Sequence, residues 1–134
     1  MTEDVEFIQS DDQTIAILIR ASLSPEKTTF ISPEDHEQQV GFVVYPAQGE
    51  IQAHKHVRLD RHIQSTSETL IVRKGQAEVR LYDEGQNLVA ERILDAGDIL
   101  VLVSGGHGFR MLEDTVLLEV KQGPYTGLKE KEHF

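Results

Sequence analysis

Cysteine is absent from this chain, and so are long hydrophobic runs. Without cysteine there can be no disulfide, no thiolate metal ligand and no nucleophilic thiol. The longest apolar runs, such as residues 99–103, are far shorter than the ~20 residues that a membrane helix needs. The first residues, 1–6, are acidic and lack the basic start and apolar block of a signal peptide. We therefore expect a cytoplasmic protein with no membrane partner.

Basic residues are also scarce, because 13 lysines and arginines face 23 acidic residues and the net charge is -10. Proteins that bind the phosphate backbone of nucleic acids need a clustered basic surface. The charge balance thus argues against a nucleic-acid partner. With 134 residues and no internal repeat, the chain is expected to form a single domain, 1–134.

What the chain does contain is a series of short apolar runs rich in valine, isoleucine and leucine. Turn residues interrupt these runs every eight to twelve positions, a spacing typical of an all-β sandwich or barrel. One short turn of helix is expected where Ser32 and Pro33 begin residues 32–35. The clearest β-hairpin joins residues 76–82 and 88–93 through the turn at 83–85. The predicted strands are residues 14–19, 40–45, 51–56, 69–72, 76–82, 88–93, 99–103, 108–112 and 116–121.

Two of the predicted strands, residues 69–72 and 99–103, are apolar on both faces. Neighbouring residues of a strand point to opposite sides of the sheet, and one face of an antiparallel sheet is commonly exposed to solvent. A second subunit that covers the outer face would explain the pattern. We therefore expect a homodimer.

Histidine and glutamate residues form two separated groups that could bind a metal. Residues two apart on a strand share a face, so His54 and His56 are expected to point the same way as Gln52. Glu68 opens an otherwise apolar strand, and His107 follows two glycines. Imidazole and carboxylate suit divalent transition metals, and this ligand set does not discriminate among Fe, Mn, Zn and Ni.

These residues resemble the two motifs of a small single-domain cupin. The residues that resemble the first motif are Gly49, His54, His56, Glu68 and Gly75. Those that resemble the second motif are Gly97, Asp98 and His107. The resemblance implies a jelly-roll barrel of two antiparallel sheets with little helix. It also implies a divalent metal held by His54, His56, Glu68 and His107. It places the core at about residues 40–121 and leaves 1–10 and 128–134 as loose tails.

The stretch from His56 to Glu68 is longer than in most cupins, so residues 57–67 are expected to form an enlarged loop beside the metal. Asp60 is a rival to Glu68 for the carboxylate ligand because it lies closer to His56. Arginine suits an anionic ligand, and an enlarged loop that carries arginines could bind one. The candidate substrate-binding residues are Gln52, Arg58, Arg61 and His62, the last also a possible fifth metal donor.

Three functions are compatible with this pattern. The first is a metal-dependent enzyme, an isomerase or a dioxygenase, acting on a small oxygenated metabolite such as a sugar derivative. Residues 119–125 add a weaker resemblance to bacterial cupins associated with surface-polysaccharide biosynthesis. The second is a non-catalytic module that binds or senses a small molecule. The third is a metal-free sugar-nucleotide isomerase or epimerase with a histidine base and a tyrosine acid, for which Tyr45 and Tyr82 are the candidates.

Overall fold

The computed structural model describes residues 4–134, apart from the side chain of Leu128. Over this range the regular structure is almost entirely β, as the sequence predicts, and the one helical element is a 3-10 turn, η1. The elements are β1 (Val5–Ser10), β2 (Gln13–Ile19), β3 (Thr29–Phe30), β4 (Gly41–Phe42), β5 (Glu68–Lys74), β6 (Gln76–Tyr82), β7 (Leu88–Asp95), β8 (Ile99–Leu102), β9 (Gly106–Met111), β10 (Val116–Lys121) and η1 (Gly127–Glu130).

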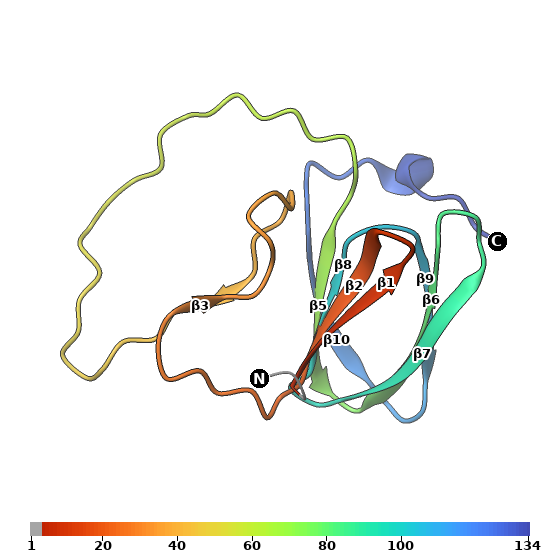
Figure 1. The fold of residues 1–134 in the computed structure, drawn as a ribbon, viewed down its shortest axis with the longest axis horizontal. Helices are drawn as coiled ribbons and strands as arrows, with labels where there is room; N and C mark the ends of the chain where they lie inside the picture. The colour runs from red at the N-terminus through yellow and green to blue at the C-terminus, as the bar shows by residue number, and fades with distance from the viewer. Residues whose placement is uncertain (1–3) are drawn as a thin grey trace.

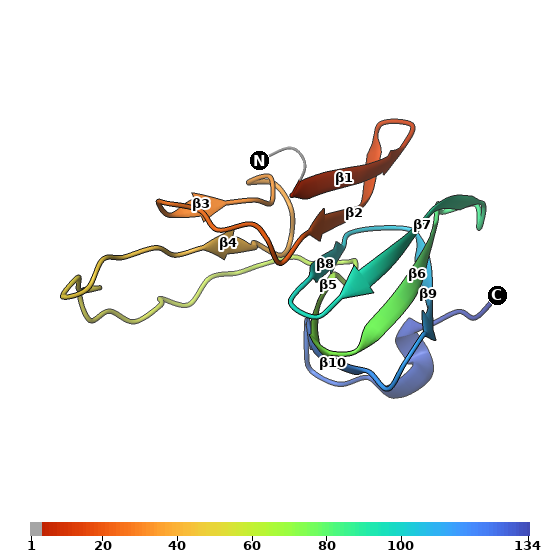
Figure 2. The same cartoon turned by 90° about the horizontal axis from the view of Figure 1, so that it is seen from below.

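Two antiparallel sheets face each other and form a sandwich (Figures 1 and 2). The larger sheet has the strand order β1-β2-β8-β5-β10, and the smaller has the order β7-β6-β9. The expected hairpin between residues 76–82 and 88–93 is confirmed as β6 and β7. Within residues 4–134 no ladder joins β9 to β10, so the two sheets do not close into a barrel.

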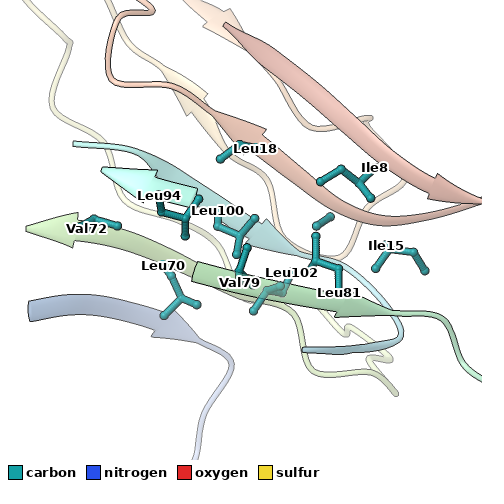
Figure 3. Packing of buried hydrophobic residues seen from close by; sticks show 11 residues of the cluster. Ile8, Ile15, Leu18, Leu70, Val72, Val79, Leu81, Leu94, Leu100 and Leu102 are labelled. Carbon is teal, nitrogen blue, oxygen red and sulfur yellow. The ribbon is translucent and has the colours of Figure 1, made fainter. Parts of the chain in front are cut away.

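The main core lies between the two sheets (Figure 3). Alternation along each strand sends every second side chain inward, so β2, β5, β6 and β8 each contribute buried aliphatic residues. At roughly 25 cal/mol for each Å² of apolar surface removed from water, this cluster is the main source of stability. Its buried members are Ile8, Ile15, Ala16, Leu18, Leu70, Val72, Val79, Leu81, Leu94, Leu100 and Leu102.

A second cluster covers the outer face of the larger sheet at β2 and β8. Ile17 and Val101 point away from the main core and are buried by Ile31, with Val40 and Phe42 packed against them. The apolar outer face of residues 99–103 therefore needs no second subunit here, because the chain's own segment around β3 and β4 covers it. The outer face of β10 differs, since Leu118 and Val120 are 45% and 49% exposed.

Residues 43–67, called the arm below, leave the sandwich after β4 and return to it at β5 as one wide loop (Figures 1 and 2). Gly41–Phe42 is the part of the predicted strand 40–45 that forms, and residues 51–56 adopt no regular structure. The strand prediction for 51–56 was wrong for this conformation. A strand needs a neighbour to pair with, and nothing in the described chain lies beside this segment.

Both ends of the chain are more ordered than the sequence suggests. Residues 5–10 form β1 and contribute Ile8 to the core, so the prediction of a loose tail and of a core that begins near residue 40 was wrong. At the other end, the ring of Phe134 stacks edge-on against Tyr82, with 5.0 Å between the ring centroids. The helical turn expected at 32–35 does not form.

No helix in residues 4–134 is long and apolar enough to cross a membrane.

The buried carboxylate of Asp98 fixes the turn between β7 and β8. Its Oδ1 accepts a hydrogen bond from the Ala21 backbone N at 2.8 Å, and its Oδ2 accepts from the Asp95 backbone N at 2.8 Å and from Arg20 at 3.0 Å. Gly97 has a φ of 92°, a left-handed conformation that lets the chain turn just before Asp98. Asp98 is 4% exposed, so its carboxylate is almost fully removed from water and depends on these three donors. The Gly97-Asp98 pair therefore has a structural role.

Asp98→Ala should lower the free energy of unfolding by about 3 kcal/mol, because it leaves the backbone N–H groups of Ala21 and Asp95 and the Arg20 guanidinium without this acceptor. Urea denaturation followed by circular dichroism measures this. Glu91→Gln is the control, since the Arg80–Glu91 pair is exposed, 53% and 41%, and its loss should change the stability far less. Equal losses in the two variants would contradict the structural role of Asp98.

Candidate functional site

Glu68 and His107 meet between the two sheets at one end of the sandwich. Glu68 is the first residue of β5 and lies opposite Leu102 of β8, while His107 on β9 lies opposite Leu81 of β6. The distance from His107 Nε2 to Glu68 Oε1 is 3.5 Å. The resemblance to the cupin motifs implied that these two residues, 39 positions apart in the sequence, belong to one metal site.

Burial shifts the pKa of both groups toward the neutral form. Desolvation, together with a hydrogen bond to Glu119 and the negative charge of Glu119, raises the pKa of Glu68 to about 7. The pKa of Glu119 is lowered, chiefly by its hydrogen bond to Glu68. The two carboxyl groups thus share one proton, which Glu68 holds at pH values below about 7. Burial also lowers the pKa of His107, so its imidazole is neutral at pH 7 and has a lone pair to offer.

A cavity of about 1020 Å³ opens beside this pair, and Glu68 and His107 form part of its wall. Its lining is strongly acidic, with eight carboxylates and one lysine. His36 and His133 also line it, although the sequence gave no reason to assign them a role. His36 Nδ1 is buried and has no hydrogen-bond partner within the described part of the chain. Such an atom is costly to bury, which is consistent with a ligand contact in the cavity.

His54 and His56 lie on the exposed arm, away from Glu68 and His107. Their rings are close to each other, with centroids 5.3 Å apart. His54 Nδ1 lies 2.8 Å from the carbonyl oxygen of Gln52, a contact in which the ring nitrogen donates and Nε2 stays free. The expected placement of Gln52, His54 and His56 on one inward face depends on a strand that does not form. Residues 4–134 bring no three potential metal-binding side chains together.

The other predicted ligand-binding residues, Arg58, Arg61 and His62, are also exposed on the arm, as is Asp60. The structure thus divides the predicted site in two. One carboxyl group and one imidazole are positioned by the sheets, and three imidazoles and two guanidinium groups are carried on a projecting loop. Glu119, next to Glu68, was missed because a polar residue in the last strand of a sequence looks like an ordinary solvent-facing position.

Glu68→Gln should flatten the pH dependence of stability of the metal-free protein. A raised pKa means that Glu68 contributes stability fully below its ordinary value of 4.5, and this contribution is lost as pH rises through about 7. The wild type should therefore lose about 2 kcal/mol relative to Glu68→Gln between pH 5 and pH 8.

Urea denaturation at both pH values in the presence of a chelator measures this difference. Glu119→Gln should also reduce the pH dependence, because it removes the neighbouring negative charge that raises the pKa of Glu68. If the wild type and Glu68→Gln lost stability in parallel, the burial and proton sharing described for Glu68 would be wrong.

Comparison with known proteins gives no independent identification. No known family, no curated protein and no solved structure matches this chain. The function must be argued from the residues themselves and from the way the fold positions them.

Proposed function

We propose that this protein is a cupin-type metalloprotein that binds one divalent transition metal, Fe, Mn, Zn or Ni, between its two sheets. The observation that supports this proposal is the 3.5 Å approach of His107 Nε2 and Glu68 Oε1 at the wall of a large cavity. The first is a neutral nitrogen donor and the second an oxygen donor, the two types that these ions prefer. Both are part of the ligand pattern that resembles the cupin motifs.

The chemistry of the two donors fits a metal better than it fits a salt bridge. Glu68 has 14% of its side chain exposed, and its charged form is unfavourable without a cation nearby. A divalent ion would supply that charge and displace the proton from the carboxyl group. The sheets alone provide two protein ligands, and His54 and His56 would complete the set of four.

A bound metal would act as a Lewis acid or, if it is iron, as an electron donor to O₂. The cavity beside Glu68 and His107 is at the upper end of the usual range for small-molecule sites, about 300–1,000 Å³. It could hold a small oxygenated metabolite, such as a sugar derivative, next to the metal. The reaction would then be an isomerisation or an oxygenation, and a protein without turnover would be a binding or sensing module.

Purified wild-type protein should contain close to one metal ion per chain, as measured by elemental mass spectrometry. His54→Ala/His56→Ala and Glu68→Ala/His107→Ala should each reduce the metal content at least tenfold, because each variant removes two of the four ligands. His133→Ala is the matched control, since His133 lines the cavity but is not a proposed ligand. An unoccupied wild type after reconstitution with each of the four metals would rule out the proposal.

One observation favours a second candidate, the metal-free sugar-nucleotide isomerase. His107 and Tyr82 line the same small pocket of about 150 Å³, so a histidine base and a tyrosine acid lie near each other. Tyr45, the other tyrosine considered, is 52% exposed on the arm. For this candidate, isomerisation of sugar nucleotides should persist in excess chelator. It should fall about 10²-fold or more in Tyr82→Phe and in His107→Ala. Activity lost on chelation would exclude it.

A further inference from the structure

The cavity beside Glu68 and His107 is more acidic than the chain as a whole. Eight of its 24 lining residues are aspartate or glutamate, whereas 23 of all 134 residues are. Among the described residues, one lysine and no arginine line it. With the histidines neutral, eight carboxylates and one lysine give the lining a formal charge of -7. The net charge of the chain, spread evenly over its surface, would not produce this concentration of acidic residues.

These carboxylates surround the cavity and do not belong to a single strand. Apart from Glu68, they come from the β1–β2 turn, the segment between β3 and β4, the β6–β7 turn and the residues after β10. Both turns and η1 lie at the upper end of the sandwich in Figure 1. The fold thus brings acidic residues from distant parts of the sequence to one rim. Charges of one sign around a cleft add to each other and concentrate ions of the opposite sign inside it.

Hydrogen bonds hold part of this rim in place. The carboxylate of Glu37 accepts a hydrogen bond from Ser65 Oγ at 2.6 Å. The carboxylate of Glu84 accepts one from the Gly105 backbone N at 2.9 Å. Neither donor carries a charge, so these bonds fix two carboxylates at the cavity wall and leave their negative charge uncompensated.

Basic side chains of the protein neutralise little of the charge on the rim. Within residues 4–134, the one lining carboxylate that forms an ion pair with a lysine or arginine is Glu130, which lies 2.9 Å from Lys121 Nζ. The other lining carboxylates include Asp12, Asp35 and Glu132, which are exposed to solvent. Most of the negative charge is therefore available to a cation that enters the cavity.

His36, which lies between Asp35 and Glu37 in the sequence, gives an independent indication of a ligand. It lines the cavity, and its buried Nδ1 has no hydrogen-bond partner within residues 4–134. Buried polar atoms are nearly always paired in folded proteins. In the tautomer that leaves Nδ1 a lone pair, a hydrogen-bond donor on a ligand would satisfy it. A protonated amine is such a donor, and it is also the cation that the neighbouring carboxylates would attract.

We propose that the ligand of this cavity is a small oxygenated metabolite that carries a protonated amine, such as an amino sugar. Its ammonium group would lie among the carboxylates of the rim, and its hydroxyl oxygens would lie toward Glu68 and His107. This inference rests on the proposed metal site and deepens it, because it gives the charge of the ligand. A divalent ion at Glu68 and His107 would change the formal charge of the lining only from -7 to -5, so the preference for a cation would survive metal binding.

The same lining disfavours anionic ligands. Arg58 and Arg61, which suggested an anionic ligand from the sequence, are exposed on the arm and do not belong to the cavity lining. A sugar nucleotide would bring the negative charges of its diphosphate into an acidic cavity, where like charges repel. An amine-bearing ligand therefore favours the metalloprotein over the sugar-nucleotide isomerase.

A series of sugars that differ in charge tests the proposal on the metal-free protein. Isothermal titration calorimetry in excess chelator, at about pH 6.5 so that the amine is protonated, compares glucosamine with glucose, glucuronate and uridine diphosphate glucose. Glucosamine should bind about tenfold more tightly than the others, and this advantage should shrink as the salt concentration rises. Equal binding of glucosamine and glucose, tighter binding of either anion, or no binding of glucosamine would overturn the proposal.

A pair of double variants tests whether the rim carboxylates are responsible. Asp12→Asn/Asp35→Asn removes two exposed charges from the lining and should weaken glucosamine binding about tenfold without changing the affinity for glucose. The matched control is Glu113→Gln/Asp114→Asn, which removes the same charge from the exposed segment between β9 and β10, outside the lining. Equal losses in the two variants would mean that the overall charge of the chain attracts the amine, and the cavity would then not be its site.

Because the titrations are made without metal, this proposal and the metal site can fail separately. A preference for glucosamine in a protein that binds no metal would retain the amine-bearing ligand and reject the metal site. A protein that binds metal but shows no such preference would reject the amine-bearing ligand alone.

Discussion

The structure depends on one constraint, which is that a β-strand must satisfy its backbone N–H and C=O groups. In the centre of the larger sheet, β2, β8 and β5 meet this constraint on both sides, and they carry most of the buried core. Along β9 and β10 the constraint is met on one side only. The arm, with its exposed apolar side chains, is the one long segment of the described chain that could meet it on the other.

The same geometry accounts for the chemistry at Glu68 and His107. Glu68 starts a strand whose next inward residues, Leu70 and Val72, are buried, so its carboxyl group is drawn partly into an apolar environment. Burial raises its pKa, and the nearby Glu119 adds to the effect. A carboxyl group held in this way has little use as a surface charge. It would be a good ligand for a cation, because the fold already holds the carboxyl group in place and a bound cation would favour its charged form.

Strands with a clear period of two and well-marked turns could be predicted from the sequence. The hairpin of β6 and β7 and the glycines at 75 and 97 follow from local residue preferences, and local preferences are visible in one sequence. The spacing from Glu68 to Gly75 likewise identified β5, and the motif pattern brought Glu68 and His107 together.

The arm could not be predicted in this way. The alternation in residues 51–56 tells which side chains share a face only if a neighbouring strand exists, and the identity of that neighbour is a property of the whole fold. His36 was missed for a related reason, because its place in the cavity wall depends on how residues 31–40 cross the outer face of the larger sheet.

A metal held by Glu68 and His107 together with His54 and His56 of the arm would couple metal binding to the position of the arm. A metal that binds only when the arm lies beside Glu68 and His107 would stabilise that state by RT ln(1 + [M]/Kd), or about 2.7 kcal/mol at a hundredfold excess over Kd. The arm would then be free at low metal concentration and docked at high concentration, with no need for a second conformational change elsewhere. The eleven residues between His56 and Glu68 would then give the arm the length that this movement requires. A wide spacing between the second and third proposed ligands is what such a site would require, because His54 and His56 lie on a projecting arm whereas Glu68 is held by the sheet.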